Sequence, residues 1–125
     1  MNNTRNAVGW FEIYVQDMVR AKAFYEETFE VKLEALPSPI IKMYAFPFLP
    51  DKPGCPGALV KMEGFESGGN STIIYFSCVD CAIESARAGK SGGKIFKEKF
   101  SIGGYGFISL VHDTEGNLIG LHSIK

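Results

Sequence analysis

Two ionisable side chains, Glu12 and His122, occupy stretches of the chain that otherwise alternate like β-strands. A glutamate between Trp10 and Tyr14 is rarely buried unless it is paired, so it is either a solvated rim carboxylate or a working group. As a functional residue, Glu12 serves as a general base or pairs with a cationic ligand. His122 is an acid, a base or a metal ligand, and its alternative is a solvated or structurally hydrogen-bonded imidazole.

The three cysteines offer less chemistry. Cys78 and Cys81 form a C-x-x-C pair, but a thioredoxin-type motif needs its first cysteine near a helix N-terminus, where the thiol pKa falls. Cys78 instead ends a predicted strand, so small buried residues are the better interpretation of the pair. No second pair of Cys or His completes a zinc site. Cys55, in a loop rich in proline and glycine, stays open as a reactive thiol.

The elements that must position these groups begin with a strand over residues 8–15 and a helix over 18–29. One face of the strand carries Trp10, Glu12 and Tyr14, and the other is uniformly apolar and should pack on the helix. Asp17 is a good N-cap for that helix. Apolar and small residues then follow at helical spacing: Ala21, Phe24, Tyr25, Thr28 and Phe29.

A weaker copy of this strand and helix appears later in the chain, over residues 72–79 and 81–90, with Asp80 in the place of Asp17. Ile83 and Ala86 are expected to face inward from the second helix. Further strands are predicted at residues 31–36, 40–48 and 58–63, and at 94–100, 105–112 and 118–124. Each copy is therefore β-α-β-β-β, which predicts an α+β fold. We expect one domain over residues 1–125, with modules at 8–63 and 72–124 and a linker at 64–71.

The bulk composition is that of an ordinary globular chain. Its 125 residues carry a net charge of −1, so no global field attracts nucleic acid or an anionic membrane. Lys94, Lys97 and Lys99 form a small cluster that Glu98 interrupts, which indicates a solvated strand face. No apolar stretch is long enough to cross a bilayer, and residues 1–6 lack a signal-peptide core, so we expect a cytoplasmic protein.

The order of these segments resembles the vicinal oxygen chelate superfamily, which includes glyoxalase I, bleomycin-resistance proteins and extradiol dioxygenases. Four segments carry the resemblance over nearly the whole chain: residues 10–15 with Asp17, the Ala23-Phe24-Tyr25 run, residues 92–95, and residues 112–121, which are similar to the family's Asp-Pro-x-Gly-Asn-x-x-Glu-Leu ending. The resemblance implies two modules whose curved sheets surround a cleft. It also implies a homodimer, because subunits of that family often share or exchange modules.

The metal ligands of that family do not carry over to this sequence. The first ligand, a His, Gln or Glu seven residues before the capping Asp, corresponds to Trp10, and its counterpart in the second module corresponds to Ile73. The glutamate expected after the Gly-Asn turn corresponds to Gly120. The fourth position falls within residues 59–61 and offers no good ligand. Since these side chains cannot donate lone pairs to a divalent cation, we expect no cofactor and a divergent, glyoxalase-related protein.

The predicted ligand-binding cleft takes its residues from the inward strand faces: Trp10, Glu12, Tyr14, Ile73, Tyr75, Gly120 and His122. Gly120 leaves room for a ligand, and Trp10 and Tyr75 are expected to clamp a planar or apolar group. Three functions fit this cleft. The first is a metal-independent small-molecule binding protein. The second is a lyase-, isomerase- or dioxygenase-type enzyme with Glu12 and His122 as catalytic residues, and with a substituted divalent metal left open. The third is a dimeric structural module. The expected partners are a small molecule and a second copy of the chain, without nucleic acid or membrane.

Overall fold

The computed structural model describes residues 5–125, so residues 1–4 of the predicted domain lie outside the described part. The first module contains β1 (Phe11–Tyr14), α1 (Met18–Phe29), β2 (Glu34–Leu36), β3 (Lys42–Ala45) and β4 (Gly57–Lys61). The second contains β5 (Tyr75–Ser77), α2 (Cys81–Lys90), β6 (Lys94–Ser101), the short 3-10 helix η1 (Gly103–Tyr105), β7 (Phe107–His112) and β8 (Leu118–Ser123). The duplicated α+β order that the sequence predicts is confirmed.

Each module folds its strands into a four-stranded mixed sheet with the same pattern. In the first sheet the order is β1-β4-β3-β2, and in the second it is β5-β8-β7-β6. The opening strand of each module runs parallel to the closing strand, and the other neighbours are antiparallel. Parallel neighbours require a crossover connection, which α1 and α2 begin in their modules.

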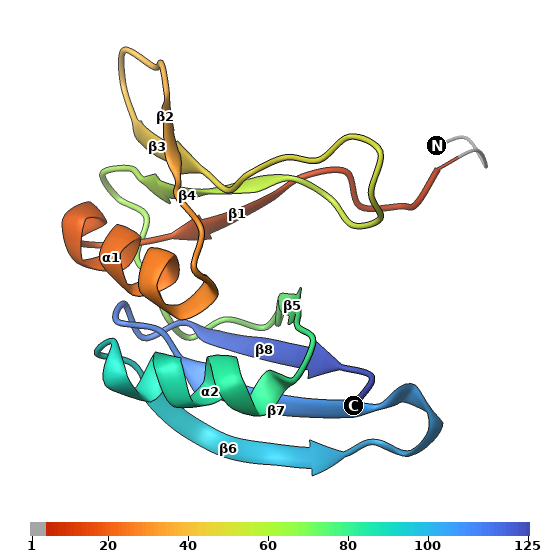
Figure 1. The fold of residues 1–125 in the computed structure, drawn as a ribbon. Helices are drawn as coiled ribbons and strands as arrows, with labels where there is room; N and C mark the ends of the chain where they lie inside the picture. Colours follow the sequence, from red (N-terminus) through yellow and green to blue (C-terminus); the bar gives the residue numbers. More distant parts are fainter. Residues whose placement is uncertain (1–4) are drawn as a thin grey trace.

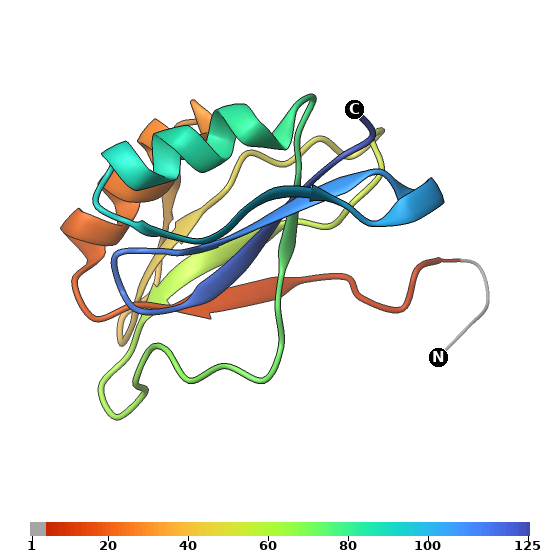
Figure 2. The same cartoon turned by 90° about the horizontal axis from the view of Figure 1, so that it is seen from below.

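The two sheets lie one above the other, and the two helices lie side by side (Figure 1). Turned by 90°, the same structure shows both helices on one side of the strands (Figure 2). Neither α1 nor α2, the two α-helices of the described residues, is long and apolar enough to cross a membrane.

Helix α1 covers the predicted residues 18–29 and begins at its predicted N-cap. The side chain of Asp17 accepts a hydrogen bond from the backbone N–H of Arg20, and Glu30 ends the helix in the left-handed conformation at φ 52°. Four of the five residues predicted on the apolar face are buried: Ala21, Phe24, Tyr25 and Thr28. The fifth, Phe29, is half-buried, and Met18 is buried in addition. This face anchors the first sheet.

The face of α2 differs from the one the sequence predicts. Ile83 is 50% exposed and Ala86 is also exposed, so the expectation that they face inward is wrong. The buried residues are instead Cys81, Ser85 and Ala88. The cause is a buried hydrogen bond: the hydroxyls of Ser109 on β7 and Ser85 on α2 share it at 2.9 Å inside the core. This contact turns the small residues of α2 toward the sheet.

Several predicted strands are longer than the observed ones. The strand predicted over 8–15 is β1 over only four residues, and the one predicted over 72–79 is β5 over three. For β1 the cause lies in its partner, because the parallel ladder opens at the pair Phe11 and Gly57. Pro56, which precedes β4, has no N–H to donate, so the ladder cannot extend in that direction.

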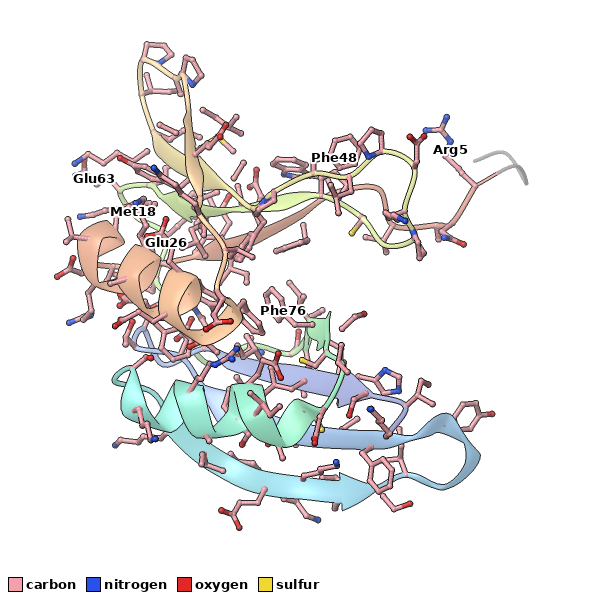
Figure 3. All side chains as sticks on the ribbon, in the orientation of Figure 1. Arg5, Met18, Glu26, Phe48, Glu63 and Phe76 are labelled. Atoms are coloured by element: carbon pink, nitrogen blue, oxygen red, sulfur yellow. The ribbon has the colours of Figure 1, made fainter. Side chains whose placement is uncertain are left out.

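One hydrophobic core joins the modules. It includes Ile13, Val15, Phe24 and Leu59 from the first module and Val111, Ile119 and Leu121 from the second. Phe76 on β5 projects toward the first module (Figure 3), with its ring centroid 4.3 Å from that of Phe29 and 5.6 Å from that of Phe46. The helix-side faces of the two sheets therefore pack toward each other, and the alternate faces point away from the core.

Candidate functional site

Trp10, Glu12 and Tyr14 lie together on the outer face of the first sheet. The exposed Glu12 carboxylate accepts hydrogen bonds from the Trp10 indole N–H at 3.2 Å and from the Tyr14 hydroxyl at 2.8 Å. The hydrogen bond to Glu12, together with burial and the glutamate's charge, raises the pKa of Tyr14. The other side of Tyr14 stacks on Phe65, with ring centroids 5.0 Å apart. Glu12 is thus an exposed carboxylate held between two aromatic donors.

On the outer face of the second sheet, Tyr75 covers Gly120. The two residues are direct partners in the β5–β8 ladder, and a Cβ on Gly120 would lie 2.3 Å from the ring of Tyr75. The space left by the missing side chain is therefore filled by the Tyr75 ring, which is itself 46% exposed. Ile73 lies just before β5 and is half-buried.

His122 has a structural partner close by. Its Nε2 atom lies 2.7 Å from the carbonyl oxygen of Tyr105 in η1, and because a carbonyl only accepts, this nitrogen carries the proton. His122 also pairs with Ser77 across the β5–β8 ladder. His112, on the neighbouring strand, makes an edge contact with Phe96 at 5.6 Å. The imidazole of His122 is thus positioned by the chain itself.

The two outer faces adjoin at a small pocket between β1 and β8. Its lining includes Glu12, Leu118, Asn70 and Thr72, and its volume is about 180 Å³. Most small-molecule sites hold roughly 300–1,000 Å³, so this pocket is too small to be a complete site. Sequence reasoning missed both Asn70, in the predicted linker, and Thr72, at the start of the strand predicted over 72–79, because this polar segment has no periodicity that would reveal which side chains face a pocket.

Within one copy of the chain, the predicted cleft is divided into two half-sites. The first carries Trp10, Glu12 and Tyr14, and the second carries Tyr75 and the strand around Gly120. The sheets pack through their opposite faces, where Phe11 and Phe76 rings lie 6.2 Å apart. Because side chains alternate along a strand, the half-sites face outward on different sheets.

A buried polar cluster at the β7–β8 turn holds the half-sites in register. Asp113 accepts hydrogen bonds from the Tyr25 hydroxyl at 2.6 Å and from the Asn117 side-chain amide at 3.0 Å. The Asn117 amide also donates to the backbone carbonyl of Tyr14 at 2.9 Å. Burial, then the charge and hydrogen bond of Asp113, raise the pKa of Tyr25 well above its usual value. These contacts tie β1 to the start of β8.

Glu115 completes the same cluster. Its buried carboxylate accepts from the backbone N–H groups of Gln16 and Asp17, both at 2.9 Å, and from the guanidinium of Arg20 at 2.7 Å. Burial alone raises the pKa of Glu115, but the hydrogen bonds from Arg20 and the two backbone groups outweigh it and lower the pKa to about 2. Glu115 therefore stays ionised and joins the second module to the start of α1.

The thiols of the C-x-x-C pair are protected. Cys81 is fully buried at the start of α2, and its backbone N–H donates to the Ser123 hydroxyl. Burial, then the nearby Glu84 carboxylate, raise the pKa of the Cys78 thiol to about 12. Since the thiolate is the reactive form, these two cysteines are poorly suited to redox chemistry.

The family's metal does not fit the residues at its ligand positions. Trp10, Ile73 and Gly120 offer no lone pair suited to a divalent cation. In the part of the chain from residue 5 to residue 125, no three His, Cys, Asp or Glu side chains are placed to hold a metal ion. Glu12 and His122, the pair considered for a substituted metal, each have a hydrogen-bond partner within their own module. No chemical step through a metal is derived for this site.

A chain of two β-α-β-β-β modules with outward sheet faces belongs to a recognisable class of fold. At the level of sequence, no profile of a known protein family and no curated protein matches it. Solved structures do match. A maize glyoxalase I mutant superposes with a TM-score of 0.74 at 18% identity, over 93% of this chain and 45% of that chain. The chain thus spans less than half the length of the maize enzyme.

Two shorter proteins match along their full length. An antibiotic-binding protein of Streptomyces sp. CB03234 has a TM-score of 0.72 and 23% identity, over 98% of both chains. A glyoxalase/bleomycin resistance protein/dioxygenase family enzyme of Burkholderia phytofirmans PsJN has a TM-score of 0.69 and 16% identity, over 94% of this chain and 98% of that chain. The chain therefore has the vicinal oxygen chelate fold.

Proposed function

We propose that this protein binds a small planar or apolar molecule, without a metal, in a cleft that two copies of the chain build together. One observation carries the proposal: aromatic rings occupy two of the positions that correspond to the family's metal ligands. Trp10 stands at the first ligand position and is 42% exposed, and the Tyr75 ring covers Gly120 at another. Aromatic walls with a few polar groups are the usual lining of a small-molecule site.

A second copy of the chain is the natural cover for the outer faces. Large apolar side chains stay exposed on them, including Trp10, Leu36, Tyr75 and Phe96. Exposed apolar patches of this kind mark interfaces or ligand sites. A two-fold axis would place the first-sheet face of one copy against the second-sheet face of its partner, which joins the two half-sites.

Two further observations favour a binding protein over an enzyme. The Streptomyces neighbour, which matches along its whole length, is an antibiotic-binding protein. In this chain, the two candidate catalytic groups are already engaged: Glu12 with Trp10 and Tyr14, and His122 with Tyr105. A lyase-, isomerase- or dioxygenase-type reaction would have to break these contacts before using either group.

The free thiols of the chain support a cytoplasmic location as part of the proposal. All three cysteines, Cys55, Cys78 and Cys81, are free. Free thiols persist in reducing compartments, so the proposed binding protein works in the cytoplasm.

The test is a ligand screen with the sole tryptophan, Trp10, as the reporter. Planar aromatic compounds should raise the melting temperature, since a ligand at a hundred times its Kd adds about 2.7 kcal/mol of stability. The same compounds should change the Trp10 fluorescence, whereas Ni²⁺, Zn²⁺ and Fe²⁺ should leave the melting temperature unchanged. Trp10→Ala should abolish binding, and Val19→Ala, an exposed change on α1, should not.

Three results would contradict the proposal. Stoichiometric metal in the purified protein would restore the chelating alternative. Ligand binding that survives Trp10→Ala would place the site elsewhere. A ligand-saturated protein that light scattering shows to be monomeric would exclude a cleft shared by two copies.

A further inference from the structure

A second space lies between the modules, on the helix side of the sheets, and the proposed cleft does not use it. It is a half-open groove of about 500 Å³, within the usual size of small-molecule sites. Four phenylalanines from three different elements and one loop line it: Phe11, Phe29, Phe46 and Phe76. Leu49, from the β3–β4 loop, lines its rim and is 63% exposed.

The aromatic walls have a shape that suits a flat guest. Phe76 stacks on Phe29 with an angle of 23° between their planes, while its ring lies at 51° to that of Phe46. Phe11 meets Phe76 edge-on at 87°. The groove therefore offers both ring faces and ring edges to a bound molecule. Aromatic groups pair favourably with both, by stacking on a face or by meeting an edge.

Glu84 is the one charged residue among the described residues that line the groove. Its Oε1 atom is buried and has no hydrogen-bond partner among the described residues. The thiol of Cys78 lies beside this carboxylate but satisfies it only weakly, because a thiol is a weak donor and its proton is shared with the carbonyl of Phe76 at 3.5 Å. A buried carboxylate oxygen without a donor is costly, and a ligand that supplies one removes that cost.

Two cations on α2 or bonded to its N-cap pair with acids other than Glu84. Arg87, one turn further along α2, pairs with Glu30 at 3.3 Å. Lys99 pairs with Asp80, the N-cap of the same helix, at 2.8 Å. None of the ion pairs among the described residues includes Glu84, so its charge is open to a cationic ligand.

We propose that this groove binds a flat apolar molecule that carries one ammonium group. The apolar part lies among Phe11, Phe46 and Phe76, and the ammonium donates to Glu84. A charge-assisted hydrogen bond of this kind is about twice as strong as a neutral one, and aromatic faces attract cations further. This site is distinct from the proposed cleft: Tyr75 borders both, but Trp10 and Glu12 are not part of the lining of the groove.

The probe for the test is 1-naphthylmethylamine, with 1-naphthaleneacetate as an anion of similar size and shape. The amine should bind and the acid should not. Glu84→Gln should weaken amine binding roughly tenfold to a hundredfold, the value of a hydrogen bond to a charged group. Glu27→Gln, an exposed change on α1, is the matched control and should leave the affinity unchanged.

Nuclear magnetic resonance locates the probe. Bound amine should shift the methyl signals of Val31, which lines the groove and not the small pocket between β1 and β8, together with those of Ile74, and leave the indole signal of Trp10 in place. Should Glu84→Gln fail to fold, the wild-type protein still gives a readout, because amine in the groove should slow alkylation of Cys55 on its lining. Equal affinity for amine and acid, full affinity in Glu84→Gln, or a shift of Trp10 without one of Val31 would each overturn the proposal.

Discussion

The buried carboxylate of Glu115 lies 2.7 Å from the Nε atom of Arg20, and this ion pair crosses from the second module to the first helix of the first. The two partners differ in exposure, since the glutamate side chain is fully buried and the arginine side chain is 52% exposed. The carboxylate also caps the backbone of Gln16 and Asp17, at the point where β1 turns into α1. One acid thus fixes the junction that positions the Glu12 half-site.

Removing the charge of Glu115 should destabilise the whole chain. Glu115→Gln replaces a carboxylate that accepts five hydrogen bonds with a neutral amide, and hydrogen bonds to charged groups are worth about 1.5–3 kcal/mol. We expect a loss of roughly 2–3 kcal/mol in the free energy of unfolding, measured by urea denaturation. Glu27→Gln, which is exposed on α1, should change stability by less than about 0.5 kcal/mol. Equal stabilities of the two variants would contradict this role.

The same carboxylate predicts a loss of stability in acid. Its pKa is about 2 in the folded chain, below the ordinary value of 4.5, so between these values the unfolded chain binds more protons. Stability from Glu115 is therefore complete above about pH 5 and falls as pH drops toward about 2, by at most about 1.4 kcal/mol per pH unit. The stability gap between the wild type and Glu115→Gln should shrink over this range. A gap that is constant from about pH 6 to about pH 3 would contradict the assignment.

The Tyr25 hydroxyl provides a second link between the modules. It donates to the buried Asp113 at 2.6 Å, and the tyrosine itself is fully buried. Tyr25→Phe keeps the packing and removes one donor from a buried carboxylate, which should cost roughly 1–3 kcal/mol in urea denaturation. Tyr105→Phe is the matched control, because Tyr105 is 80% exposed, and it should be nearly neutral. A neutral Tyr25→Phe would show that Asn117 and the backbone satisfy Asp113 without the tyrosine.

The cysteines should react with very different rates. Cys55 is partly exposed in a loop, Cys81 is fully buried, and the pKa of Cys78 is raised to about 12, so little of its thiolate is present near neutral pH. Iodoacetamide should therefore modify Cys55 at least about tenfold faster than the other two. Peptide mass spectrometry measures each site, and Cys55→Ser should remove the fast phase. Fast modification of Cys78 would reopen the redox interpretation of the C-x-x-C pair.

The spacing of the hydrophobic residues and the helix N-caps explain why so much of the fold could be predicted. Asp17 and Asp80 both cap helices, and the alternation from Trp10 to Val15 assigns each side chain to the correct face. The error in α2 has the opposite cause. Ser85 is polar, so a hydrophobicity pattern assigns it to solvent, but its hydroxyl is satisfied inside the core by Ser109. A pairing between residues far apart in sequence leaves no local signal.

The candidate site also separates what one strand specifies from what depends on residues far apart in the sequence. Alternation correctly places Trp10, Glu12 and Tyr14 on one face, because that is a property of a single strand. Whether this face meets Tyr75 depends on which sides of the sheets pack together, and the contact of Phe46 with Phe76 decides it. Asn70 and Thr72 line the pocket beside Glu12 through the path of the linker, which composition alone cannot specify.

Tyr75 and Gly120 should prove to be energetically coupled. Gly120 is not in the left-handed region, so its backbone accepts alanine, but the new Cβ would lie 2.3 Å from the Tyr75 ring. Gly120→Ala should therefore displace the ring and cost roughly 1–3 kcal/mol, as overpacking does. In a Tyr75→Ala background the same change should cost much less, which gives a coupling energy of about 1 kcal/mol in a urea double-mutant cycle.

Additive effects, within about 0.3–0.5 kcal/mol, would mean that the ring leaves Gly120 without resistance. Coupling has a consequence for the chemistry of the fold. A glutamate at position 120, where the resemblance to the vicinal oxygen chelate superfamily implies a metal ligand, would need the volume that the Tyr75 ring now fills. An aromatic wall and a chelating carboxylate therefore exclude each other at this point of the sheet, and this chain has the aromatic wall.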